Sequence, residues 1–159
     1  MWYFMITCYV MSLLSLILVT TAFLQSFFKF SVFQANHLTF MILTAIVYLL
    51  TETLVIFFFV DIGMQIKEST LHKKLDPQFH RRSIAIKRRV FPPLMSNLLW
   101  MVAVFVLVGA VDTHQFPQWA YRLLFLGGIL HLGKTKRIEN QGFREYTEIV
   151  REMGRVPSE

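Results

Sequence analysis

Four long apolar stretches dominate the sequence and restrict what this chain can fold into. They cover residues 2–27, 38–64, 94–111 and 119–132, and the last is the shortest. A helix needs roughly 20 predominantly apolar residues to cross the ~30 Å hydrocarbon core of a bilayer. The pattern predicts an all-α integral membrane protein, folded as a bundle of four transmembrane helices.

The composition agrees with a surface that faces lipid. Of the 159 residues, 55% are hydrophobic and only 16% are charged, whereas a soluble domain carries about 25% charged residues. The first stretch lacks the charged start of a secretory signal, and its apolar run exceeds the ~7–15 residues usual for one. We therefore expect it to be a retained helix.

Basic residues predict the orientation in the membrane. Fourteen of the sixteen Lys and Arg lie either between 65 and 92 or after Leu132. Because positive loops stay on the cytoplasmic side, we expect a basic inner loop over 65–92 and both termini in the cytoplasm. The net charge of +6 then reflects topology, and no nucleic-acid partner is expected. Five of these residues are expected to fix the orientation or to hold anionic lipid headgroups: Arg81, Arg82, Lys87, Arg88 and Arg89.

Two further features bear on the helices. The consecutive Pro92 and Pro93 are typical of a helix start, so we expect the third helix to begin there. Residues 137–159 alternate apolar and charged positions at helical spacing. We expect them to form an amphipathic tail that follows a transmembrane domain over 1–136 and lies on the membrane face or docks on a partner.

One acid interrupts the second apolar stretch, in the segment YLLTETLVIFFFVD at 48–61. A charge at a helix centre costs roughly 2.5–3.5 kcal/mol on insertion scales, so Glu52 should face the bundle rather than lipid. Helical spacing places it in a polar seam with His37, Thr44, Tyr48 and Thr51.

The seam is expected to face small residues of the other helices that permit close packing: Ser12, Ser15, Gly127 and Gly128. Glu52 has either a functional or a structural role. In the functional role it transfers protons, with Tyr48, or binds a ligand; in the structural role it is a protonated acid bonded to a serine or threonine.

Histidines suggest a metal or haem site. His37 begins the second stretch, and Asp112 and His114 occupy the turn between the third and fourth, so all three are expected at the outer surface. Imidazole and carboxylate groups are suitable metal ligands, and two histidines could ligate a haem b. His131 is a further candidate axial ligand, or else a helix-end residue. The alternative for the outer group is ordinary polar contact with water or headgroups. The single cysteine, Cys8, excludes an intrachain disulfide.

No phosphate-binding loop, nucleophile elbow, paired-cysteine motif or zinc-protease motif occurs in the sequence. The first hypothesis is an accessory or structural subunit of a larger membrane complex of energy metabolism, without catalytic activity of its own. One alternative is a small redox, metal- or haem-binding membrane protein in which Glu52 carries protons. Another is a homo-oligomeric channel or carrier with Glu52 lining the path. The expected partners are membrane lipid, other membrane subunits and further copies of the chain.

Overall fold

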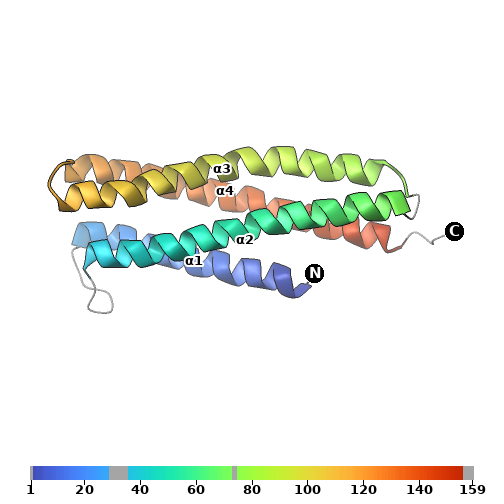
Figure 1. The fold of residues 1–159 in the computed structure, drawn as a ribbon, viewed down its shortest axis with the longest axis horizontal. Helices are drawn as coiled ribbons and strands as arrows, with labels where there is room; N and C mark the ends of the chain where they lie inside the picture. Colours follow the sequence, from blue (N-terminus) through green and yellow to red (C-terminus); the bar gives the residue numbers. More distant parts are fainter. Residues whose placement is uncertain (1, 29–35, 73–74, 156–159) are drawn as a thin grey trace.

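A computed structural model of the chain describes residues 2–28, 36–72 and 75–155, and within these ranges the regular structure is entirely helical. The helices are α1 (Trp2–Phe28), α2 (His37–His72), α3 (Gln78–Asp112) and α4 (Gln118–Met153). They form one elongated up-and-down bundle (Figure 1). Each helix packs on the next, and α1 also packs on α4, so that α2 and α4 lie on a diagonal.

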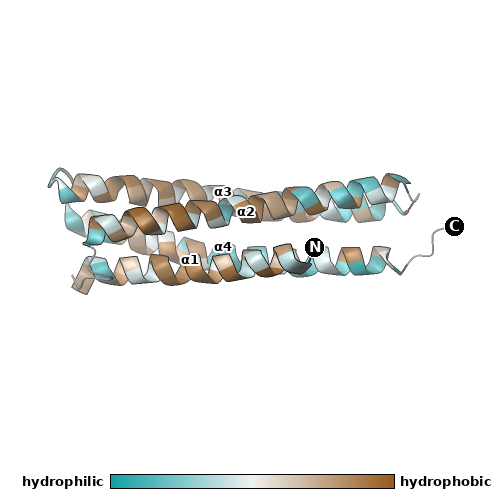
Figure 2. Ribbon diagram, turned by 60° about the horizontal axis from the view of Figure 1, so that its bottom comes forward, coloured by the Kyte–Doolittle hydropathy of each residue, from teal (hydrophilic) through white to brown (hydrophobic). Residues whose placement is uncertain are grey.

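The membrane prediction is confirmed for three of these helices. Tyr3–Phe28 of α1, together with α2 and α3, is long and apolar enough to cross a bilayer. We call the end of the bundle that holds the N-terminus of α1 and the C-terminus of α4 the inner end, and the opposite end the outer end. Figure 2 shows apolar residues concentrated toward the outer end and hydrophilic residues toward the inner end, where α2, α3 and α4 continue past the start of α1.

Two predicted boundaries are wrong. The stretch from 65 to 92 is mostly helix, because α2 reaches His72 and α3 begins at Gln78. Pro92 and Pro93 lie inside α3 instead of starting it. The fixed φ of proline is compatible with a helix, and the carbonyls that lose their donors belong to the exposed Arg88 and Arg89. Water or lipid headgroups can bond to carbonyls at such a site.

The predicted tail is not a separate element. Residues 137–153 continue α4 without a break, residues 154 and 155 follow the helix, and residues 156–159 lie outside the described part. The apolar side of this half-helix is buried against the bundle rather than laid on a membrane surface, and Phe143, Tyr146 and Ile149 are at most 3% exposed. The helical periodicity in the sequence therefore identified a face that packs on the chain's own helices.

Two hydrophobic cores fill the bundle. The outer core contains Met41, Val104 and Phe125 among others. The inner core contains Phe59 and Phe143. Between them the buried side chains are polar, and this polar layer is where the candidate site lies.

Candidate functional site

Three charged side chains meet in the polar layer, and we call them the charged cluster: Glu52 of α2 with Lys136 and Glu139 of α4. The Nζ atom of Lys136 donates to Oε1 of Glu52 at 2.7 Å and to Oε2 of Glu139 at 2.9 Å. Lys136 and Glu139 share one face of α4 because they are three residues apart. The side chains of Glu52 and Glu139 are 1% and 2% exposed, against 15% for Lys136.

The charged cluster holds more carboxyl groups than cations. Within the described part of the chain, Oε2 of Glu52 and Oε1 of Glu139 are buried without a hydrogen-bond partner. An uncompensated buried charge is costly, so a carboxyl in this position tends to take up a proton. Glu139 lies beyond the apolar stretch of α4, and burial raises its pKa, an effect that Lys136 opposes and Glu52 reinforces.

Other polar groups surround the charged cluster. Cys8 of α1 and Tyr48 of α2 lie within electrostatic range of it. The thiol of Cys8 donates to the Leu54 carbonyl oxygen at 3.8 Å. On α3 the polar layer continues with Asn97, which does not titrate. Within the described residues, the ion pairs of the charged cluster join only its own three members.

Asn97 links three helices on the outer side of the cluster. Its Nδ2 donates to the Tyr48 hydroxyl at 2.7 Å, which leaves its Oδ1 to accept from Nδ1 of His131 at 3.2 Å. The His131 ring also stacks on Trp100 with the ring centroids 6.1 Å apart. Thr135 Oγ1 lies 3.4 Å from the same Nδ1. His131 is thus held inside a polar network, and its predicted role at a helix end does not match its position.

The predicted seam on α2 does face the bundle interior, because Thr44, Tyr48, Thr51 and Glu52 are all fully buried. The seam also contacts α1 beside Ser12, because the Thr51 hydroxyl donates to the Met11 carbonyl oxygen at 3.3 Å. Over the described ranges, the acid itself does not bond to a serine. Glu52 bonds to Lys136 of α4, whereas Ser15 Oγ is buried without a partner in the described residues and Ser12 is half-buried.

The predicted glycine pair also lies elsewhere. A Cβ atom on Gly127 or Gly128 would come within 2.9 Å or 3.2 Å of the Trp100 side chain. These glycines therefore let α4 approach α3 and do not lie opposite the acid of α2.

The outer histidines do not assemble the predicted metal site. His37 lies 3.4 Å from Oε1 of Gln25 and 3.3 Å from the hydroxyl of Tyr121. Asp112 and His114 are exposed, and His114 has a positive φ of 58° in the turn between α3 and α4. Among the residues that the structure describes, no three His, Cys, Asp or Glu side chains come close enough to share a metal ion.

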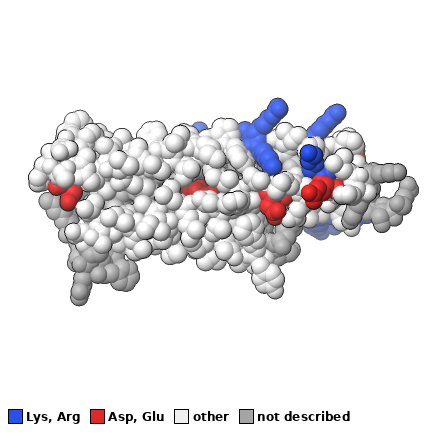
Figure 3. Space-filling model, in the orientation of Figure 1, with Lys and Arg blue, Asp and Glu red and all other residues white. Residues whose placement is uncertain are grey.

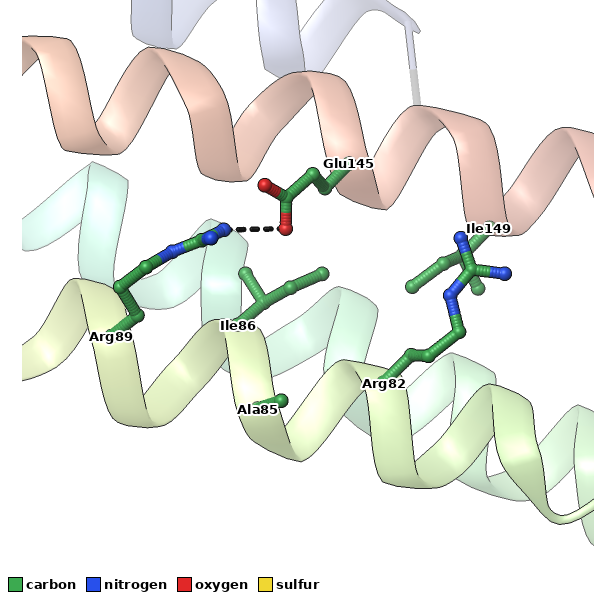
Figure 4. Close-up of a pocket in the computed structure, with 6 residues that line it drawn as sticks. All are labelled: Arg82, Ala85, Ile86, Arg89, Glu145 and Ile149. Carbon is green, nitrogen blue, oxygen red and sulfur yellow. Dashed lines mark hydrogen bonds and ion pairs between the residues drawn. The ribbon is translucent and has the colours of Figure 1, made fainter.

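The basic residues of α3 lie toward the inner end, where Figure 3 shows most of the visible Lys and Arg side chains. Arg82 pairs with Glu152 and Arg89 with Glu145. Figure 4 shows Arg89 directed at Glu145 across a pocket of about 210 Å³ whose floor includes Ile86 and Ile149. Two of the five predicted headgroup residues are therefore neutralised by α4. The exposed Arg81 and Arg88 form no ion pair within the described part.

Comparison of the chain with protein-family models, with curated proteins and with solved structures finds no match. The function must therefore be argued from the geometry of the charged cluster and its surroundings. Lys136 and Glu139 were not among the residues selected from the sequence. A buried acid inside a membrane usually pairs with a cation at the same depth. A search for such a cation on the other helices could have identified Lys136.

Proposed function

We propose that this chain is a small multi-pass membrane protein whose charged cluster binds and releases a proton, as part of a larger membrane complex. The observation that carries the proposal is the sharing of one lysine by two buried carboxyl groups, each with an unpartnered oxygen. A single proton makes this group of three electrically neutral. Perturbed, buried titratable groups of this kind are typical of functional sites.

The two protonation states differ in a definite way. With the proton bound to Glu139, Lys136 and Glu52 form a neutral ion pair, and the Glu139 hydroxyl becomes a donor. After the proton leaves, Lys136 is shared between two carboxylates and one excess negative charge lies between the two apolar cores. Water does not screen charges in this buried polar layer. Gain or loss of the proton on Glu139 therefore favours different positions of the Lys136 side chain.

The proposed topology has four spans and both termini in the cytoplasm. The predicted fourth span, 119–132, belongs to α4, where Tyr121 lies beside His37 at the outer end of α2. This contact supports a fourth span level with the others. The gathering of Lys and Arg at the inner end supports a cytoplasmic inner end.

A second candidate function is that of an accessory subunit with no proton chemistry. The observation that favours it is the continuation of α2, α3 and α4 beyond the start of α1, which presents a charged helical surface outside the apolar section. In that case the charged cluster only holds α2 and α4 together. The two candidates differ in whether a carboxyl of the cluster carries a proton near neutral pH.

A hydrophobic carbodiimide tests this difference. The reagent takes the proton of a neutral carboxylic acid, its carbon bonds to the carboxyl oxygen, and the product rearranges to a stable N-acylurea that mass spectrometry detects. We expect an adduct on Glu139 or Glu52 near neutral pH, declining as the pH rises, and none in the Glu52→Gln/Glu139→Gln double variant. Glu148, which is exposed on the same helix, is the internal control. Absence of a cluster adduct at every pH, or equal modification of Glu148, would leave only the accessory role.

The complex is tested separately by purification from membranes in a mild detergent. We expect the chain to elute with other subunits or in several copies. Elution of a single copy, in detergent that preserves other complexes of the same membrane, would contradict this part of the proposal.

A further inference from the structure

A pocket of about 400 Å³ opens between α1 and α4 on the inner side of the charged cluster. We call it the inner pocket. Its lining includes Met5, Tyr9, Arg144, Thr147, Glu148 and Arg151. The charged residues of this lining belong to the half of α4 beyond its apolar stretch, so the inner pocket is suited to hold water.

A hydrogen bond joins α1 to α4 at the outer side of the inner pocket, near the bundle surface, where Tyr9 is 39% exposed. The hydroxyl of Tyr9 on α1 donates to Oδ1 of Asn140 on α4 at 2.7 Å. The Tyr9 ring also packs on Phe143, with the ring centroids 5.2 Å apart. The bond therefore joins α1 to α4 at a place where the Tyr9 ring already fills the space between them.

The charged cluster begins one helical turn beyond this bond. Lys136 is four residues before Asn140 on α4 and therefore lies on the same face, about 6 Å further from the inner end. Ser12 follows Tyr9 by three residues on α1, on the side that faces α4. Lys136 is also the most exposed member of the charged cluster, at 15%. The interface between α1 and α4 thus leads from the inner pocket to Lys136.

The outer direction offers no comparable route. Beyond Tyr48 the bundle axis is filled by the outer core, in which Met41, Val104 and Phe125 are at most 1% exposed. The buried Thr44 lies among these apolar residues, but its hydroxyl donates to the carbonyl oxygen of Phe40 on its own helix. His37 and Tyr121 lie further on, at the outer end. A proton would have to cross several layers of apolar side chains to arrive from that side.

We infer that the inner pocket is the entrance through which water and protons reach the charged cluster, and that the Tyr9–Asn140 hydrogen bond closes this entrance. The inference rests on the proposed function and adds the compartment with which the site exchanges its proton. It assigns Tyr9 and Asn140 a positioning role, since within the described residues their side chains bond to each other and not to the carboxyl groups of Glu52 or Glu139. Opening requires the Tyr9 side chain to leave both Asn140 and Phe143, and loss of the hydrogen bond makes that movement easier.

Thiol accessibility tests the entrance without reference to the proton. In a Cys8→Ala background, Ser12→Cys places a thiol just beyond the Tyr9–Asn140 bond. A charged, membrane-impermeant methanethiosulfonate is then added to vesicles from the inner-end side. The Tyr9→Phe change should accelerate labelling about 2- to 10-fold, the range expected from the loss of one hydrogen bond. The matched control for loss of a tyrosine hydroxyl is Tyr3→Phe, on the exposed start of α1, and it should leave the rate unchanged.

Ser96→Cys in the same background is the control for position, because Ser96 is exposed on α3 beside Asn97. It should not respond to Tyr9→Phe. The entrance is disproved if the Ser12→Cys thiol reacts only with reagent added from the outer-end side. It is also disproved if Tyr9→Phe leaves the labelling rate of this thiol unchanged.

Carbodiimide labelling of the cluster separates the two proposals. If it succeeds while the thiol test fails, the proton site stands and this entrance is wrong. If the thiol test alone succeeds, the entrance stands and the proton site is wrong.

Discussion

The Nζ atom of Lys136 lies 2.7 Å from Oε1 of Glu52, although the two residues are 84 positions apart in the chain. The pair joins α2 to α4 across the diagonal of the bundle, where few backbone contacts fix their relative height. A buried ion pair contributes little net stability compared with an apolar pair of similar volume, but loss of one partner is costly. Its structural effect is therefore to help set the register between two helices that meet through side chains, such as the Phe59 and Phe143 rings, whose centroids are 5.0 Å apart.

The replacement Lys136→Met should destabilise the bundle by about 3–5 kcal/mol, because it leaves two buried carboxyls without their shared cation. The free energy of unfolding in detergent measures the effect, and the exposed Lys134→Met is the matched control. The double variant Glu52→Leu/Lys136→Met should recover part of the loss, because only Glu139 is then left without its cation. If the double variant is as unstable as the sum of its single changes, the two residues do not interact as described.

Glu139 should make stability depend on pH. Burial raises its pKa above the ordinary value of 4.5, so the folded protein holds this proton more tightly than the unfolded chain does. The contribution of this group is therefore complete below 4.5 and is lost as the pH rises toward the raised pKa. Glu139→Gln, which still offers Lys136 an oxygen, should flatten this part of the curve. Glu148→Gln should not alter it, and equal curves for Glu139→Gln and the unmodified protein would refute the assignment.

Two glycines should respond differently to the same change. A Cβ atom on Gly142 would lie 2.9 Å from both the Phe59 ring and a Val90 methyl, whereas one on Gly63 would meet the end of the flexible Lys87 side chain. Overpacking costs typically 1–3 kcal/mol, and alanine is favoured over glycine in a helix by up to about 1 kcal/mol. Gly142→Ala should therefore be the less stable variant by about 1–3 kcal/mol, as measured by unfolding in detergent. Equal stability would mean that α4 does not approach α2 and α3 this closely.

Asn97→Leu should destabilise the outer part of the polar layer. It removes the donor to the Tyr48 hydroxyl and the nearer of two partners of His131 Nδ1, and a buried polar group left unpartnered costs about 1–3 kcal/mol. Ser96→Leu is the control, because its side chain is exposed on the neighbouring position of α3. Besides the unfolding free energy, the fluorescence of Trp100 should change only in Asn97→Leu, since this ring stacks on His131. No difference between the two variants would show that the network contributes nothing.

The parts of the fold that depend on local pattern were predictable from the sequence. Apolar runs identify α1, α2 and α3 because lipid demands them, and the acid in the second run had to face inward. The partner of that acid was missed for a physical reason. Lys136 follows the last apolar run among other cations, so it resembles an inner-side residue placed by topology, and only the fold shows that it turns into the bundle. In the same way, Pro92 and Pro93 are typical of a helix start in sequence, yet α3 passes through them.

The order in which the helices are made has a consequence for assembly. Ribosomes add roughly 5–20 residues per second, so roughly 4–17 s separate the synthesis of Glu52 from that of Lys136, which lies 84 positions later. During that interval α1 and α2 exist with an unmatched acid between them. The carboxyl group of Glu52 therefore stays unpaired until α4 is made. In a chain that stops before Lys136 this unpaired acid remains, and membrane quality control could recognise it.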